Sequence, residues 1–438
     1  MKTWRCLLWI LVLTSLSLAG ASAQSWAVRY SGGEDCFSSK IRIGSDGSSY
    51  VAGTQTRLGV DRVLLIRYKP GGVLTWKVTY GGADTNRAFD MALDASDNIY
   101  LAGLHHGDHG NDFLILKYSP SGTLLWEQIY DGTASGVDNA KAIQVDSAGN
   151  VYVAGFVTNT NRDFAVIKYN TNGVFQWSYL FDGGDGNESA NALALDSANN
   201  VVAVGQVTRA GRALDYYTVK LNGATGAPLW RRFYDRANIN DFATAVAVDS
   251  SGNVLVTGRA FNALSILDYV TIKYTSTGAV KWAKRYDSGG HDAATAIATD
   301  TQGNVYVTGE SWANDVTRAD WLTIKYNSDG LVQWKKRQGT TGEDSPSIIN
   351  VDASYNVFVG GYINRAAGAI GATPEQDAYL AKYNSAGSIV FTARYNGAAN
   401  NMDSVVDFAL FQGDIYATLY SYTGVRGNIV TRKYDQTP

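Results

Sequence analysis

The sequence predicts an all-β protein, an eight-bladed β-propeller built from four-stranded antiparallel blades. Three observations predict it. Four short apolar segments, separated by turn residues, recur along almost the whole chain. The aromatic residue of the fourth segment returns every 50 to 57 residues, and a Lys or Arg that ends the third segment returns as often. A fixed period of this size with four strands per unit is typical of propeller blades.

Two independent anchors count the repeating units. The aromatic anchors are Trp26, Trp76, Trp126, Trp177, Trp230, Trp282, Trp334 and Phe391. The basic anchors are Arg67, Lys117, Lys168, Lys220, Lys273, Lys325, Lys382 and Lys433. Both sets have eight members, so we predict eight blades.

The unit at residues 140–177 shows the four segments most clearly. Its first segment, AKAIQVD, is joined to the second, VYVAG, by a short turn that contains Gly149. Glycine readily adopts the positive φ that a tight antiparallel turn requires. The third segment, DFAVIKY, turns through Gly173 into the fourth, VFQWSYLF. We name these four strands a, b, c and d.

Side-chain size predicts which strand of a blade lies innermost. Strand a is rich in alanine, as at Ala190, Ala192 and Ala194, whereas strand d carries Trp and Tyr. Blades crowd together at the axis of a propeller and separate toward its rim. We therefore expect strand a at the axis and strand d at the rim.

The two ends of the repeat region are incomplete. The segment SWAVRY at residues 25–30 reads as a lone strand d, and the last unit supplies only strands a, b and c. We expect the N-terminal strand to join the last blade and close the ring, because closure removes the exposed sheet edges that invite aggregation.

Residues 1–23 read as a secretory signal peptide, followed by a single propeller domain at residues 24–438. Lys2 and Arg5 precede an apolar run, and Ala21-Ser22-Ala23 fits a cleavage site. No later apolar run approaches the roughly 18 residues that a membrane span needs. We predict an exported protein, secreted or periplasmic.

The net charge of the chain argues against some classes of partner. Removing residues 1–23 takes away two of 37 basic residues and none of 40 acidic ones, which leaves a net charge of −5. A mildly acidic chain without a Lys/Arg block argues against nucleic acid or anionic lipid as partners.

After removal of residues 1–23, Cys36 is the only cysteine, so no intrachain disulfide can form. We expect a monomer stabilised by packing and ring closure.

The repeat also carries a family resemblance. The recurring pattern D-S-x-G-N-V-Y-V-T/A-G, followed by D-F/Y-x-x-I-K-Y-N-x-x-G-x-x-x-W, resembles the secreted bacterial β-propeller repeat called SBBP. The segment TGAPLW at residues 225–230 is similar to the tryptophan-docking repeat of quinoprotein-like eight-bladed propellers. Quinoprotein dehydrogenases generally add a vicinal disulfide, which one mature cysteine cannot form, so this second resemblance implies the scaffold and not the enzyme.

Loop length distinguishes the two faces of the predicted ring. The a–b and c–d turns share one face and hardly vary in length. The b–c connections vary from 7 to 15 residues in the first seven blades, and they share the other face with the d–a connections. A rigid scaffold usually carries its binding loops where variation is concentrated. We name this the variable face and expect a protein or glycan ligand there.

Polar residues recur where strand a begins on this face. They are Asn86, Asp138, Glu188, Asp241, Asp292, Asp344 and Asp403, with Cys36 in blade one. We expect them to surround the mouth of the channel, where carboxylates could hold a cation, an amine or sugar hydroxyls. The alternative is structural, since each side chain could accept hydrogen bonds from its own loop.

Three of the four histidines lie within five residues, in the predicted b–c loop of blade two. His105, His106, Asp108 and His109 offer imidazole and carboxylate ligands suited to Zn²⁺ or a similar divalent metal ion. Their spacing matches no established zinc signature, so a solvated surface loop is the alternative.

No catalytic signature appears. The chain lacks a G-x-S-x-G elbow, an H-E-x-x-H motif, a P-loop and a paired-cysteine motif. We therefore favour a binding module without enzymatic activity. Two alternatives stay open: a polysaccharide hydrolase or lyase that uses the acidic or metal site, and a periplasmic assembly scaffold.

Overall fold

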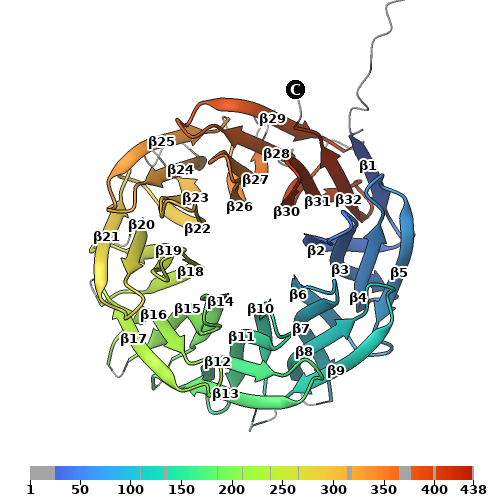
Figure 1. The fold of residues 1–438 in the computed structure, drawn as a ribbon, viewed down its shortest axis with the longest axis horizontal. Coiled ribbons are helices and arrows are strands. Elements are labelled where there is room, and N and C mark those ends of the chain that lie inside the picture. Colours follow the sequence, from blue (N-terminus) through green and yellow to red (C-terminus); the bar gives the residue numbers. More distant parts are fainter. Residues whose placement is uncertain are drawn as a thin grey trace, which may run out of the picture.

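In the computed structural model, 32 strands form eight four-stranded antiparallel sheets arranged in a ring, which confirms the predicted eight-bladed β-propeller (Figure 1). The structure describes residues 25–108, 110–132, 134, 136–184, 186–209, 211–236, 238–264, 266–312, 318–340, 342–364, 376–397 and 401–436. These residues contain no helix. The predicted signal peptide lies outside them, so its assignment stays a prediction.

Strands a and b form the inner half of each blade. The a strands are β2 (Asp35–Ile43), β6 (Asn86–Leu93), β10 (Asn139–Val145), β14 (Ser189–Leu195), β18 (Asp241–Val248), β22 (Asp292–Thr299), β26 (Ser345–Val351) and β30 (Asp403–Phe411). The b strands are β3 (Ser49–Arg57), β7 (Ile99–Gly107), β11 (Val151–Thr158), β15 (Val201–Thr208), β19 (Val254–Phe261), β23 (Val305–Ser311), β27 (Val357–Asn364) and β31 (Asp414–Tyr422).

Strands c and d form the outer half. The c strands are β4 (Val60–Tyr68), β8 (Gly110–Tyr118), β12 (Arg162–Tyr169), β16 (Leu214–Leu221), β20 (Leu267–Tyr274), β24 (Asp320–Tyr326), β28 (Gln376–Tyr383) and β32 (Gly427–Tyr434). The d strands are β5 (Leu74–Tyr80), β9 (Leu124–Tyr130), β13 (Phe175–Phe181), β17 (Pro228–Tyr234), β21 (Val280–Tyr286), β25 (Val332–Gln338), β29 (Ile389–Tyr395) and β1 (Trp26–Tyr30).

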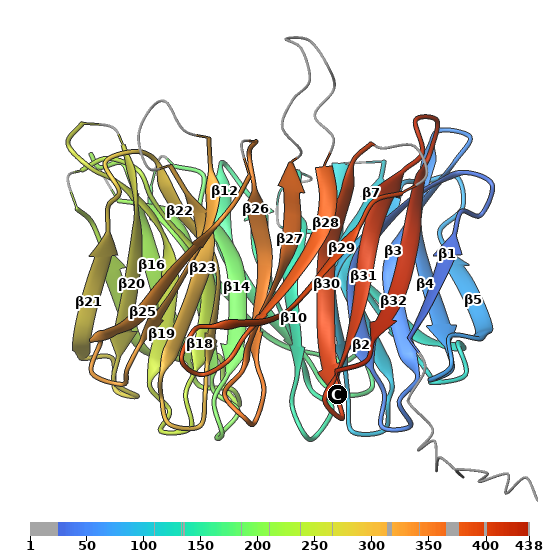
Figure 2. The ribbon, with the colours of Figure 1, turned by 90° about the horizontal axis from the view of Figure 1, so that it is seen from above.

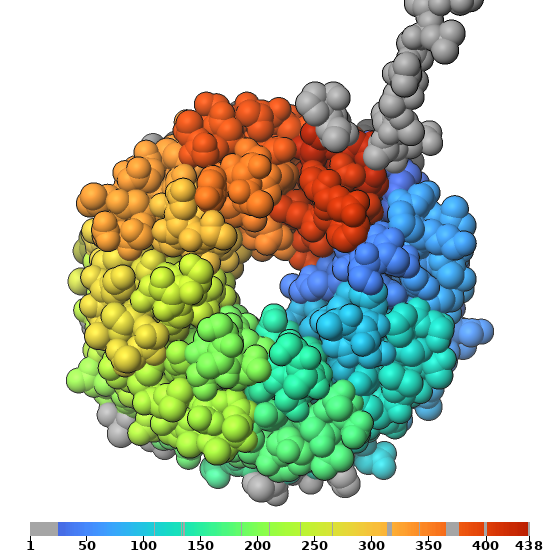
Figure 3. Space-filling view, viewed as in Figure 1, coloured from blue at the N-terminus to red at the C-terminus, as the bar shows by residue number. Residues whose placement is uncertain are grey.

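The ring closes as predicted, through the N-terminal strand. Strand β1 pairs antiparallel with β32, with Trp26 opposite Lys433 and Tyr30 opposite Ile429. The last blade therefore has the order β1-β32-β31-β30, with three strands from the end of the described chain and one from its start. Figure 3 shows the closed ring with an open channel through its centre.

The a strands surround the channel and the d strands form the rim, as side-chain size predicts (Figure 1). Every a–b pair contains an irregularity near the middle of strand a, for example between Ala140 and Ala142. In several blades the extra residue reaches the neighbouring blade: Thr244 Oγ1 donates to Ala294 O, and Ser347 Oγ donates to Val405 O. These bulges link the inner strands around the channel.

The hydrophobic core lies between the blades. Each core cluster combines the face of one blade with the facing side of the next; Tyr152 and Phe164 of blade three, for example, pack with Val201 and Tyr217 of blade four. Apolar residues on both faces of a sheet are buried in this arrangement, which explains why the b and c strands are almost continuously apolar.

The Trp anchors dock each blade onto the next one, which supports their predicted place at the rim. Each indole Nε1–H donates to a backbone carbonyl in the c–d turn of the following blade. These bonds join Trp26 to Pro70 (2.6 Å), Trp76 to Pro120 (3.1 Å), Trp126 to Thr171 (3.1 Å), Trp177 to Gly223 (3.3 Å), Trp230 to Ser276 (3.0 Å), Trp282 to Ser328 (3.0 Å) and Trp334 to Ser385 (3.1 Å). The phenyl ring of Phe391 has no N–H and forms no such bond.

The basic anchors lie beside these turns. Lys220 and Lys273 form buried ion pairs of 2.8 and 2.9 Å with Asp196 and Asp249 of their own blades. Lys117 instead donates to the carbonyl of Thr171, which also accepts from Trp126. Two further basic anchors, Arg67 and Lys433, also pair with carboxylates of their own blades, with Asp46 at 2.7 Å and with Asp414 at 2.9 Å.

Candidate ligand-binding face

The variable face lies at the upper edge of the ring in Figure 2, toward which strand β27 points, and the C-terminus lies at the opposite edge. Strands b end here, strands a and c begin here, and the d–a connections cross from each blade to the next. Side chains from four strand ends and two blades therefore meet at every blade boundary.

The recurring polar residues at the start of strand a are buried. Asp138, Glu188, Asp241, Asp292, Asp344 and Asp403 are fully buried and Asn86 nearly so. Most of their oxygens accept backbone N–H groups from adjoining loops and strand ends: Asp138 from Gly132 (2.6 Å) and Thr158 (2.6 Å), Glu188 from Thr208 (2.9 Å), Asp241 from Arg236 (3.1 Å), Asp292 from Ser288 (2.7 Å), Asp344 from Asn364 (2.7 Å) and Asp403 from Gly397 (2.6 Å). These contacts match the structural alternative; ligand binding by this set stays a prediction.

Burial also changes how these carboxyl groups titrate. It raises the pKa of Asp241 to about 7, with Asp235 and Asp215 raising it further against the effect of the backbone hydrogen bonds. Burial raises the pKa of Asp138, Glu188, Asp292, Asp344 and Asp403 as well. In blade one, burial first and then Glu34 and Asp35 raise the pKa of the Cys36 thiol to about 11. That thiol is therefore protonated at neutral pH.

His105 and His106 lie in strand β7, not in the loop that the sequence predicts. Strand β7 continues to Gly107 and pairs with β8, so His105 lies opposite Asp112 and His106 opposite Asn111. Successive side chains of a strand point to opposite faces. His105 Nδ1 contacts Asn86 Oδ1 at 2.9 Å, whereas His106 Nδ1 contacts Asn111 Oδ1 at 2.7 Å.

Metal binding at these histidines stays a prediction. Among the described residues, no group of three convergent ligand atoms includes His105, His106 or Asp108. His109 lies outside the described residues.

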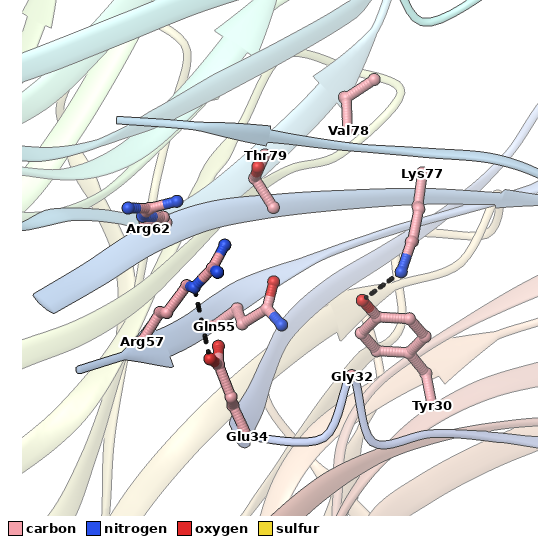
Figure 4. A pocket seen from close by; sticks show the side chains of 9 residues that line it. All are labelled: Tyr30, Gly32, Glu34, Gln55, Arg57, Arg62, Lys77, Val78 and Thr79. Atoms are coloured by element: carbon pink, nitrogen blue, oxygen red, sulfur yellow. Dashed lines mark hydrogen bonds and ion pairs between the residues drawn. The ribbon is translucent and has the colours of Figure 1, made fainter. Parts of the chain in front are cut away.

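A basic pocket of about 380 Å³ lies on the variable face between blades eight and one (Figure 4). Lys77 Nζ donates to Tyr30 Oη at 3.0 Å, and Arg57 forms an ion pair with Glu34 at 3.5 Å. Arg62 also lines the pocket, and it donates weakly to Gly82 O at 3.3 Å. Three cations and one carboxylate give this pocket a positive charge.

A second pocket, of about 490 Å³, lies on the other side of blade one, against blade two. Phe37 and Phe89 line it together with Ser38, Ser39 and Asp61. The Phe37 ring is 43% exposed and stacks on Tyr420, with centroids 5.3 Å apart and ring planes at 10°. Among the described residues, Ser38 Oγ and Ser39 Oγ have no hydrogen-bond partner. We call this the Phe37 pocket.

The channel wall is charged in the same sector. Arg42 bonds Asp407 at 2.8 Å and approaches Asp90 to 3.7 Å, and Lys40 lies 3.8 Å from Asp90. These residues come from β2, β6 and β30, so they join blades eight, one and two. Asp407 also accepts the backbone N–H of Ile41 at 3.0 Å.

Sequence reasoning from the repeat missed both the Phe37 pocket and the charged wall. The signal that could have found them is departure from the repeat. Where blades one, two and eight carry Lys40, Asp90 and Asp407, blades three to six carry alanine. Phe89 likewise occupies the bulge position where Thr244 and Thr295 stand in other blades.

Known structures share the fold. Over 94% of this chain, Sqt1 from Chaetomium thermophilum superposes with a TM-score of 0.59 at 9% identity, covering all of that protein. The quinohemoprotein alcohol dehydrogenase ADHIIG from Pseudomonas putida HK5 also superposes over 94% of this chain with a TM-score of 0.59, at 12% identity and over 76% of its own length. Identities this low show similarity of fold alone.

Sequence comparison gives one family. No curated protein matches the chain in sequence. The SBBP family, described as a beta-propeller repeat, matches residues 282–315, from Trp282 in β21 through strands β22 and β23. The predicted resemblance is thereby confirmed for this segment. The chain is an eight-bladed β-propeller in which residues 282–315 match the SBBP beta-propeller repeat.

Proposed function

We propose that the protein is a non-enzymatic binding module that recognises a glycan on its variable face, in the sector formed by blades eight, one and two. The Phe37 pocket carries this proposal. Sugar rings present apolar C–H faces and polar hydroxyls, so their binding sites combine an exposed aromatic ring with hydrogen-bonding groups. The Phe37 pocket has both, with Phe37 and Phe89 beside the ion-paired Asp61 and Arg87.

The position of the pocket supports the proposal. All eight blades repeat one scaffold, and residues that every blade carries are explained by that scaffold. The pocket instead combines the recurring Asp61 with Phe37 and Phe89, which stand at positions where the repeat varies. The basic pocket on the opposite side of blade one adds Arg57, Arg62 and Lys77 within the same sector. A glycan bearing carboxylate or sulfate groups would complement these cations.

Substitution of Phe37 tests the proposal, and blade five offers a matched control. Phe242 occupies the same repeat position in β18 and lines neither pocket. The purified chain and the variants Phe37→Ala and Phe242→Ala are compared on a panel of neutral and acidic polysaccharides. We expect Phe37→Ala to lose at least tenfold in affinity and Phe242→Ala to bind like the parent. Equal binding by all three, with thermal unfolding unchanged, would refute the assignment.

The same panel addresses the rival function. Incubation of each polysaccharide with the protein, followed by assay of new reducing ends and unsaturated products, tests for a hydrolase or lyase. Steady product formation would overturn the non-enzymatic part of the proposal.

We also propose that residues 1–23 direct export. No helix among the described residues is long and apolar enough to cross a membrane. Mass spectrometry of the processed chain is expected to find Gln24 at its N-terminus. Its recovery from the culture medium would support a secreted binding module, and recovery only from the periplasm would favour the assembly scaffold.

A further inference from the structure

Three carboxylates from three repeat positions meet at the boundary of blades three and four, on the variable face. Asp163 is the second residue of β12, Asp182 follows β13, and Glu188 precedes β14. Each offers one oxygen, and these three oxygens all lie within 4.8 Å of one another. We name this set the Asp182 cluster.

Two oxygens of the Asp182 cluster have no hydrogen-bond partner. The Asp163 side chain accepts from Asn159 through Oδ2, and Glu188 accepts the Thr208 N–H through Oε1 at 2.9 Å. Among the described residues, Asp163 Oδ1 and Glu188 Oε2 accept nothing, although Asp163 is only 5% exposed and Glu188 is fully buried. Leaving buried carboxylate oxygens without a donor or a cation is unfavourable.

Among the described residues, no side-chain cation compensates the charge of the cluster. None of the ion pairs among the described residues involves Asp163, Asp182 or Glu188. Arg162, the nearest arginine in sequence, stacks over the Phe156 ring with its guanidinium carbon 4.4 Å from the centroid. Burial raises the pKa of Asp163 and Glu188, and the charge of Asp182 raises both further.

Blade five shows the same cluster with its charge compensated. Asp268, Asp287 and Asp292 occupy the same repeat positions and also offer oxygens within 4.8 Å of one another. There Arg236 and Arg285 both bond Asp268, and Arg285 also bonds Asp287 at 2.9 Å. The repeat thus places three carboxylates together in both blades, but supplies arginine to only one of them.

Glycines let the loop backbone pack closely against the Asp182 cluster. A Cβ atom on Gly183 would lie 3.1 Å from Glu188 Oε1 and 1.8 Å from the carbonyl oxygen of Thr208. A Cβ atom on Gly186 would lie 2.8 Å from Glu188 Oε1. The loop backbone therefore approaches the carboxylates more closely than any side chain at these two positions would allow.

We propose that Asp163, Asp182 and Glu188 bind a divalent cation, with Ca²⁺ the ion that their chemistry fits best. All three ligands are hard carboxylate oxygens, and two have an unused oxygen. Ca²⁺ accepts irregular arrangements of carboxylate, carbonyl and water oxygens, whereas Mg²⁺ demands a near-ideal octahedron. The cation would tie the d–a connection that carries Asp182 to β12 and β14. This inference does not depend on glycan binding.

Calcium titration of the EDTA-treated, full propeller tests the proposal. Asp182 is the exposed member of the cluster, so Asp182→Asn removes a ligand with little effect on packing. Asp287→Asn is the matched control, because Asp287 is the exposed member of the arginine-compensated cluster. Calcium binding is measured by calorimetry, and the melting temperature is recorded with and without calcium.

We expect the parent chain to bind calcium and to melt at a higher temperature when calcium is present. Asp182→Asn should lose one equivalent or weaken it by about tenfold or more, since affinity follows the number of charged ligands. Asp287→Asn should behave like the parent. The third acidic cluster, Asp112 with Asp131 and Asp138, is checked with Asp131→Asn.

Two results would overturn the assignment. One is a parent chain that binds no calcium at millimolar concentration and melts at the same temperature with and without it. The other is calcium binding that survives Asp182→Asn at full stoichiometry and affinity, including binding that only Asp131→Asn removes.

Discussion

Replacement of Trp230 by alanine tests how the blades hold each other. The Trp230 side chain is only 9% exposed, and its ring lies 5.8 Å from that of Tyr274 in the next blade. Its Nε1–H donates to Ser276 O at 3.0 Å, in the c–d turn of the next blade. Gly278 of that turn packs so closely that a Cβ atom would lie 2.7 Å from the indole. The turn cannot easily collapse into the space that the indole leaves, so Trp230→Ala should cost about 3–5 kcal/mol of unfolding free energy.

The conservative variant separates packing from the hydrogen bond. Blade seven carries Phe391 at the same repeat position, so a phenyl ring is compatible with this site. Trp230→Phe keeps most of the buried ring and loses the N–H···O bond, which is worth about 1 kcal/mol. Urea titration followed by circular dichroism gives both values if the slope of the transition is unchanged. A Trp230→Ala cost below about 1.5 kcal/mol, or equal costs for the two variants, would refute docking by ring burial.

Three further predictions concern titration, turn geometry and closure. The pKa of Asp241 is about 7 in the folded chain and about 3.9 when unfolded. The stability this group contributes is therefore fully present below about pH 4 and lost as the pH rises through about 7. Urea midpoints should fall over that range in the parent and stay flatter in Asp241→Asn; parallel curves would contradict the raised pKa. Gly278 has a φ of +85°, so Gly278→Ala should lower the free energy of unfolding by about 1–2 kcal/mol from the backbone alone. The added Cβ atom should also displace the indole of Trp230 and change the tryptophan emission. Unchanged emission together with an unchanged urea midpoint would contradict the close approach. Deletion of residues 25–30 should expose the edge of β32 and produce aggregation in light scattering, whereas a monodisperse chain of parental stability would contradict closure by β1.

The fold could be predicted because its determinants recur. Trp230 and the other aromatic anchors mark the rim, Ala190, Ala192 and Ala194 mark the axis, and the unpaired first strand implies closure. Each pattern is local and is repeated, so errors in one copy are corrected by the others. The extent of β7 was not predicted, because backbone pairing continues past Gly103 and carries His105 and His106 into the strand.

The candidate sites depend on differences between copies, which a repeat pattern hides. Phe37 and Phe89 come from neighbouring blades, and only the packing of those blades places them in one pocket. The Asp182 cluster likewise needs residues from β12, the d–a connection and the start of the next blade. Whether an arginine neutralises such a cluster depends on side-chain direction as well as sequence, as Arg162 shows by stacking on Phe156.

Closure by a single strand has a consequence for how such a ring can change in size. Along the chain the sequence repeat runs d-a-b-c, whereas a blade runs a-b-c-d. Each sequence repeat therefore starts in one blade and continues in the next. An in-frame duplication of one repeat would therefore insert a complete blade, together with the indole that docks it and the turn that receives it. Because β1 and β32 lie in the same blade, joining them and opening the chain at another b–c connection would preserve every contact between blades. Duplication or deletion of one repeat would thus change the number of blades, whereas circular permutation would leave that number unchanged.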